Sequence, residues 1–122
     1  MVHYESIVRK GSTQYPGVSY SIHRMSFGRR SELLRHIREI GRKTEYLEAG
    51  PDFKDKIEAS LIGSEIDAMY LRWGLREVSG LLVDGEAATH ESLLERGPEG
   101  LVREILTSIR AECGLNQDEA KN

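Results

Sequence analysis

The sequence contains a single cysteine, Cys113, which excludes an internal disulfide. One free thiol in 122 residues is typical of proteins that fold in a reducing compartment. No apolar run approaches the roughly 18 residues that a membrane span requires, and the first residues lack the basic-then-apolar pattern of a secretion signal. We therefore expect a cytosolic protein without a membrane-spanning segment.

Motifs that carry chemistry are missing as well. The twelve glycines never fall into the Gly-x-Gly-x-x-Gly or Gly-x-x-x-x-Gly-Lys spacing that cradles phosphate. The four histidines, His3, His23, His36 and His90, are scattered and form no metal-binding pair. Cys113 falls on an apolar helical stripe, where a buried, inert thiol is expected. We expect no metal, no cofactor and no enzymatic activity.

What the chain does have is a balanced, charge-rich globular composition. Charged residues make up 30% and apolar residues 39% of the sequence, with a net charge of −3. A chain of this length supports one hydrophobic core and is too short for two ordinary domains. We predict a single domain over residues 1–115 and a polar C-terminal tail over residues 116–122.

The N-terminal region has the pattern of a β-hairpin. Val18, Tyr20 and Ile22 alternate with small polar residues, which is typical of a half-buried strand. A first strand is predicted within Val2–Val8, and a turn-rich stretch separates the two. Because an isolated hairpin is marginally stable, its apolar face should pack on helices or pair with another strand.

Two long helical patterns follow the hairpin. The first covers Phe27–Ala49 after Ser26 as N-cap, although Gly28 leaves Ser31 as an alternative start. Gly50-Pro51 should end this helix and turn the chain back, so that the two helices form an antiparallel pair. The apolar residues at helical spacing are Leu33, Leu34, Ile37, Ile40 and Leu47 in the first pattern and Phe53, Ile57, Leu61, Ile62, Ile66, Met69 and Trp73 in the second.

A corner follows the second helix, which we predict to begin after Asp52 as N-cap. Gly74 comes directly after Trp73, and a glycine in this position commonly ends a helix with a positive φ angle. The apolar residues of Val78–Val83 then predict a strand that enters a tight turn at Asp84-Gly85 and returns through Glu86–Ala88.

Two shorter helices complete the predicted fold. Thr89 should cap a helix over His90–Arg96, and Gly97-Pro98 should start the last helix. In that helix an apolar residue recurs every fourth position until Gly114 stops it. The recurring residues are Leu101, Ile105, Ile109 and Cys113. The predicted fold class is α+β and mainly α, with an N-terminal hairpin, a long helix pair, a short hairpin and C-terminal helices.

Positive charge is concentrated in the first long helix. Between Arg24 and Lys43 there are seven basic residues and only two acidic ones, which gives this stretch a net charge of +5 and leaves −8 for the rest of the chain. Three of them, Arg35, Arg38 and Arg42, share one stripe and are candidate interaction residues. Three interpretations remain open: a solvated or internally paired face, contact with an acidic protein, or contact with nucleic acid. The seven basic residues are Arg24, Arg29, Arg30, Arg35, Arg38, Arg42 and Lys43.

Tyr70 and Trp73 are the remaining candidate interaction residues. Both lie at the end of the second helix, and Trp73 is the only tryptophan of the chain. Aromatic side chains at such a corner serve either as core packing or as an anchor for a partner protein. We predict that Trp73 is mostly buried and packs against Leu75 or the strand that follows.

Several short motifs, taken in order, carry a family resemblance over most of the chain. They are Gly17–Ile22 leading into Arg24–Arg30, the corner Tyr70–Leu75, the turn Val83–Gly85 with Ala88-Thr89 behind it, Arg96–Glu99, and the terminal Glu119–Asn122. Together they resemble the small tail assembly chaperones encoded by long-tailed bacteriophages and prophages.

The resemblance implies a non-enzymatic factor in the cytoplasm of the bacterial host. Such a factor binds the long, helical, apolar tape measure protein, keeps it soluble, helps the tail tube protein assemble around it, and then leaves the particle. A homo-oligomer is compatible with the sequence, whereas a membrane or nucleic-acid partner is not expected. The alternatives are a minor structural or tail-completion protein, and a small nucleic-acid-binding regulator that uses the basic helix.

Overall fold

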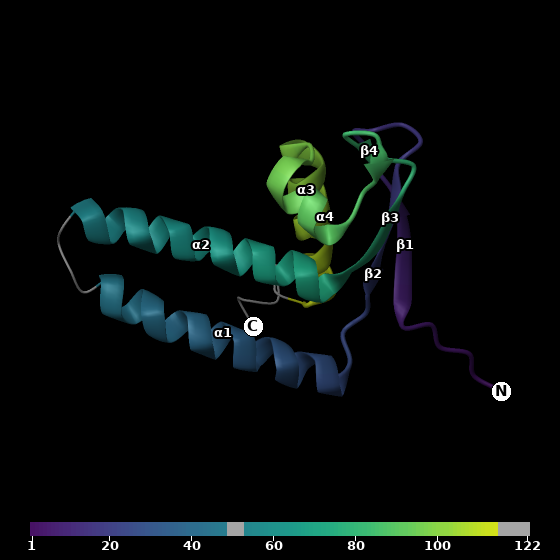
Figure 1. Cartoon of the computed structure of the whole chain (residues 1–122). Helices are drawn as coiled ribbons and strands as arrows, with labels where there is room; N and C mark the ends of the chain where they lie inside the picture. Colours follow the sequence, from purple (N-terminus) through teal and green to yellow (C-terminus); the bar gives the residue numbers. More distant parts are fainter. Residues whose placement is uncertain (49–52, 115–122) are drawn as a thin grey trace.

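The computed structural model describes residues 1–48 and 53–114, and the side chains of residues 1–42 and 56–114. The fold is α+β and mainly α, as predicted. Two long antiparallel helices form an arm that extends away from a small sheet and two shorter helices (Figure 1). In chain order the elements are β1 (Ile7–Gly11), β2 (Ser19–His23), α1 (Phe27–Glu48), α2 (Phe53–Gly74), β3 (Leu75–Ser79), β4 (Leu82–Val83), β5 (Glu86–Ala87), α3 (His90–Arg96) and α4 (Glu99–Glu112).

The main sheet has three antiparallel strands in the order β1-β2-β3. The central strand β2 pairs with β1 from Ile7 opposite His23 to Gly11 opposite Ser19, and with β3 through Ser19 opposite Ser79. Helix α4 packs against β2, so that both Tyr20 and Ile22 are buried. The expectation that the N-terminal hairpin needs a further strand or helix is therefore confirmed on both counts.

Two strand predictions require correction. The first strand begins at Ile7 rather than Val2 and continues to Gly11, because the register with β2 sets its limits. The predicted strand Val78–Val83 is divided at Gly80, whose φ angle of +81° breaks the extended backbone. The part before Gly80 belongs to β3 and joins the main sheet, whereas Leu82–Val83 forms the predicted short hairpin with β5.

The prediction of a positive φ angle at Gly74 is wrong. Gly74 is the last residue of α2, and β3 begins at the next residue without an intervening loop. Glycine is required there by close packing, because a Cβ on Gly74 would lie 2.6 Å from a side-chain carbon of Ile109 in α4. The corner thus brings α2 and α4 into close contact.

Local hydrogen bonds explain where the helices begin and end. Ser26 caps α1 by accepting the backbone N–H of Arg29 at 3.2 Å, so the helix begins at Phe27 and the alternative start at Ser31 is wrong. Thr89 and Ser92 form a capping box at the start of α3. Pro98 is the N-cap of α4 rather than its first helical residue. Gly114 ends the described chain with a φ angle of +74°.

The core lies where α4 meets β2 and the end of α2. All four apolar residues of the predicted α4 stripe are buried there, between 0% and 3% exposed, and they belong to one cluster with β2 and α2: Leu101, Ile105, Ile109 and Cys113. The predicted break at Gly50-Pro51, the N-cap Asp52 and the polar tail 116–122 lie outside the described residues. No helix in the described part is long and apolar enough to cross a membrane.

Candidate interaction surface

The structure places Tyr70 and Trp73 inside the corner between α2 and β3. Their side chains are 4% and 9% exposed, and the two rings meet edge to face with centroids 6.4 Å apart. The Arg29 guanidinium lies over the Trp73 ring at 4.5 Å, and the Arg110 guanidinium lies over the Tyr70 ring at 4.6 Å. The burial predicted for Trp73 is confirmed, and its contacts are those of a packed corner.

Arg29 and Arg110 fasten this aromatic corner to its neighbours. Arg29 also donates a hydrogen bond to the backbone carbonyl of Trp73, one of the otherwise unpaired carbonyls of the last helical turn. Arg110 forms an ion pair with Asp67 at 2.5 Å and thereby links α4 to α2. The sequence indicated Arg29 only as part of the basic region. Its position one turn before Leu33, on the inward side of α1, is the signal that distinguishes it from the exposed arginines.

Trp73 provides a direct optical test of the corner. Because it is the only tryptophan and is 9% exposed, its fluorescence should be blue-shifted in the folded protein and should move to the red on unfolding. Emission spectra recorded along a urea titration measure this shift. A native maximum typical of an indole in water would contradict the packed corner and make Trp73 a partner-binding residue instead.

The basic stripe behaves differently from the other arginines. Arg35, Arg38 and Arg42 are exposed, and none of them forms an ion pair within the described part of the chain. An internally paired face would need carboxylates of α2 as partners, but neither Glu58 nor Glu65 pairs with these arginines, and the side chains of Asp52 and Asp55 lie outside the described residues. The arginines that do pair with carboxylates are Arg9, Arg24, Arg72, Arg76, Arg96, Arg103 and Arg110. Among the residues whose side chains are described, the stripe therefore carries three cations without a carboxylate partner.

Apolar side chains are also exposed along the arm. Leu34 of α1 is 59% exposed, and Ile57 and Leu61 of α2 are 47% and 55% exposed. Phe27, the first residue of α1, is 94% exposed. The sequence pattern counted Leu34, Ile57 and Leu61 among the apolar residues at helical spacing, but the structure leaves all three exposed. Exposed apolar groups on a projecting element are a common feature of protein-binding surfaces.

A cleft of about 310 Å³ lies between α1 and α2 at the base of the arm. Glu32 and His36 line it from α1, and Met69, Arg72 and Trp73 line it from α2. Leu61 precedes Arg72 by 11 residues, which is about three helical turns, so it lies on the cleft side of α2. Exposed Ile57, one turn further out, extends this apolar side of the arm.

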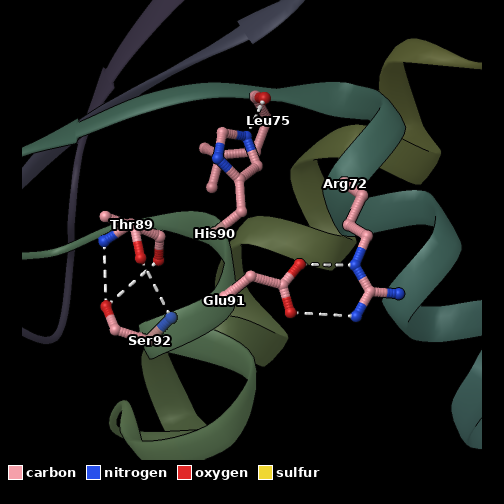
Figure 2. A network of polar contacts seen from close by, with 6 residues as sticks. All are labelled: Arg72, Leu75, Thr89, His90, Glu91 and Ser92. Carbon is pink, nitrogen blue, oxygen red and sulfur yellow. Dashed lines mark hydrogen bonds and ion pairs between the residues drawn. The ribbon is translucent and has the colours of Figure 1, made fainter.

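Helix α3 is fastened to α2 and β3 by the polar contacts shown in Figure 2. The Arg72 guanidinium donates to both carboxylate oxygens of Glu91, at 2.7 and 3.1 Å, and this contact lowers the pKa of Glu91. His90 Nε2 lies 2.6 Å from the backbone carbonyl of Leu75. Because a carbonyl only accepts, Nε2 carries the proton in this contact. Arg72, which lines the cleft, is thus paired with Glu91 of α3, and His90 connects the same helix to β3.

A second cleft, of about 450 Å³, lies between the β1–β2 loop and α4. Its principal polar groups already bind one another: the Tyr20 and Ser108 hydroxyls are 2.8 Å apart, and Glu104 accepts hydrogen bonds from the Ser12 hydroxyl and the Thr13 amide. These contacts fasten the loop to α4. The arrangement is structural, with no free set of convergent groups among the side chains named.

The described residues contain no group of three or more His, Cys, Asp or Glu side chains that could hold a metal ion. Cys113 is buried, as predicted, and its burial raises the pKa of the thiol, which therefore stays protonated near neutral pH. Burial, together with the positive charges of Arg29 and Arg76, lowers the pKa of His23, so this imidazole is neutral at pH 7. Comparisons with protein-family models, with curated proteins and with solved structures gave no match for this chain.

Proposed function

We propose that this protein is a non-enzymatic assembly chaperone of a long phage tail, and that it binds the helical, apolar tape measure protein along the cleft side of its arm. The observation that carries the proposal is the exposure of Ile57 and Leu61 in line with the cleft beside Met69 and Trp73. The family resemblance of the sequence motifs supports the choice of client. The proposed place of action is the cytoplasm of the bacterial host.

The dimensions of this surface suit a helical client. From Ile57 to Met69 the helix rises about 18 Å, which corresponds to about three turns of a helix lying alongside. An amphipathic helix binds such a surface by placing residues one turn apart into it. The charged outer face of the arm keeps the free protein soluble, while the apolar side covers a client that would otherwise aggregate. The tail tube protein would then replace the chaperone around the client.

Co-expression with the neighbouring large tail gene tests the proposal. The wild-type chain should co-purify with the tape measure protein, and Ile57→Asp combined with Leu61→Asp should abolish this because two charges would enter an apolar contact. Leu82→Asp is the matched control, since Leu82 is 68% exposed but lies on the short hairpin away from the arm. Retention of the client by the double variant would contradict the proposed surface.

Particle composition separates the chaperone from a tail-completion or other structural protein. A chaperone should be absent from purified mature tails, whereas a structural component should be present in fixed copy number. Mass spectrometry of tails made with an epitope-tagged chain measures this directly. Detection at one or more copies per tail would favour the structural alternative.

Nucleic-acid binding is the second candidate, because Arg35, Arg38 and Arg42 are exposed without carboxylate partners in the described structure. It requires DNA affinity that falls steeply with salt and is lost when all three are changed to glutamine. That triple variant should remain folded, since surface charges of this kind contribute only about 0.2–1 kcal/mol each. Tight, salt-sensitive DNA binding without client retention would overturn the chaperone proposal.

A further inference from the structure

The arm carries two exposed apolar flanks of opposite charge. On α1, exposed Leu34 lies between Arg30 and Arg38, one turn to either side, and Phe27 lies two turns before it. We call these four residues the basic flank. None of them forms an ion pair in the residues for which side chains are described.

The second flank lies on α2 and has the opposite sign. Exposed Leu61 lies between Glu58, three residues before it, and Glu65, four residues after it, and Ile57 adds a second apolar side chain. We call these four residues the acidic flank. Both glutamates are exposed, and neither pairs with a cation in the described side chains.

The two flanks point to opposite faces of the arm. Leu33 and Ile62 are buried where α1 meets α2, and successive helical residues are rotated by about 100°. Leu34 comes one residue after buried Leu33, whereas Leu61 comes one residue before buried Ile62. In an antiparallel pair these opposite rotations lead to opposite faces, so the two flanks of one molecule cannot contact each other.

We propose that the basic flank of one copy of this chain docks on the acidic flank of a second copy. The spacing matches: Arg30 and Arg38 are separated by a rise of about 12 Å, and Glu58 and Glu65 by about 10.5 Å. With Leu34 packed on Leu61, each arginine therefore faces a glutamate of the other copy. A contact between two basic flanks, or between two acidic flanks, is disfavoured because it would bring like charges together.

This contact joins two different surfaces, so one copy of a docked pair keeps a free acidic flank and the other keeps a free basic flank. Such a heterologous contact propagates from copy to copy, either as an open chain or as a closed ring. The acidic flank includes Ile57 and Leu61, which the proposed client also uses, so self-association and client capture compete. The self-association itself does not rest on the proposed function, since it needs no client.

Sedimentation velocity of the purified chain tests the proposal without any client. The wild type should associate with a Kd of about 10–1,000 µM, weak because each flank is small, and added salt should weaken the association about tenfold or more between 50 and 500 mM. Arg30→Glu with Arg38→Glu should be monomeric, and so should Glu58→Lys with Glu65→Lys. An equimolar mixture of these two variants should associate again, because the reversed flanks complement each other.

Matched variants exclude an effect of net charge. Arg9→Glu with Arg103→Glu, and Glu5→Lys with Glu86→Lys, change the net charge equally at exposed positions off the arm and should associate like the wild type. Circular dichroism confirms that each variant is folded. A wild type that stays monomeric at about 1 mM in 50 mM salt would overturn the proposal. So would flank variants that associate as the wild type does, or a variant mixture that stays monomeric.

Discussion

Replacing Gly80 by alanine is expected to destabilise the protein by about 2–5 kcal/mol, through left-handed backbone strain combined with overpacking. Gly80 has a φ angle of +81°, and a Cβ built on it would lie 2.1 Å from the backbone carbonyl oxygen of Gly17. Gly17 lies in the β1–β2 loop just before β2, and its backbone oxygen cannot yield as the end of a flexible side chain can. The substitution should therefore force the end of β3 away from the β1–β2 loop.

Two other glycines separate the causes of this effect. Gly85 has a φ angle of +84° with nothing within 4 Å of a built Cβ, so Gly85→Ala should cost only the conformational strain of about 1–2 kcal/mol. Gly63 lies in α2 with open space around it, and Gly63→Ala should stabilise the helix by about 0.5–1 kcal/mol. Urea unfolding followed by circular dichroism measures all three. Equal losses for Gly80→Ala and Gly85→Ala would show that the approach to Gly17 is unimportant.

The second large effect is expected at the contact between Gly74 and Ile109. Gly74→Ala should cost about 1–3 kcal/mol, because its Cβ would meet a side chain of the core that is 2% exposed. Ile109→Ala should cost about 2–5 kcal/mol by leaving a cavity. In the Ile109→Ala background the clash is absent and alanine is the better helix former, so Gly74→Ala should be neutral or stabilising.

A double-mutant cycle tests this coupling. The sum of the losses in unfolding free energy of the two single variants should exceed the loss of the double variant by more than about 1 kcal/mol. Such coupling is expected for residues in direct contact. Additive losses would mean that Gly74 is required for a reason other than its contact with α4. As a control for general weakening of the core, Gly74→Ala paired with Leu93→Ala, on α3, should be additive.

The functional proposals depend on the same corner. The direct passage from α2 into β3 fixes the end of α2 on α4, and Arg29, Trp73 and Arg110 hold that end in place. The rest of the arm then extends from an anchored base, with Leu34 and Leu61 left uncovered. A surface presented in this way can bind a helical client or a second copy without rearrangement of the core.

The sequence by itself determined those features that depend on neighbours in the chain. The buried stripe of α4, the Ser26 and Thr89 caps and the Asp84-Gly85 turn follow from helical period, hydrogen bonding and turn geometry over a few residues, and all were predicted. Helical period likewise placed Arg35, Arg38 and Arg42 on one stripe, and the structure has all three exposed.

Only the tertiary structure decided which elements meet and which apolar residues remain uncovered. Leu33 and Leu34 are equally apolar and adjacent, yet one is buried against α2 and the other is 59% exposed, because burial depends on the partner helix and not on the period alone. For the same reason the sequence did not predict that β3 pairs with β2, or that the Ile109 side chain packs against Gly74 where a Cβ would not fit. These contacts join residues that are far apart in the chain, and their energies arise only when the packed surfaces come together.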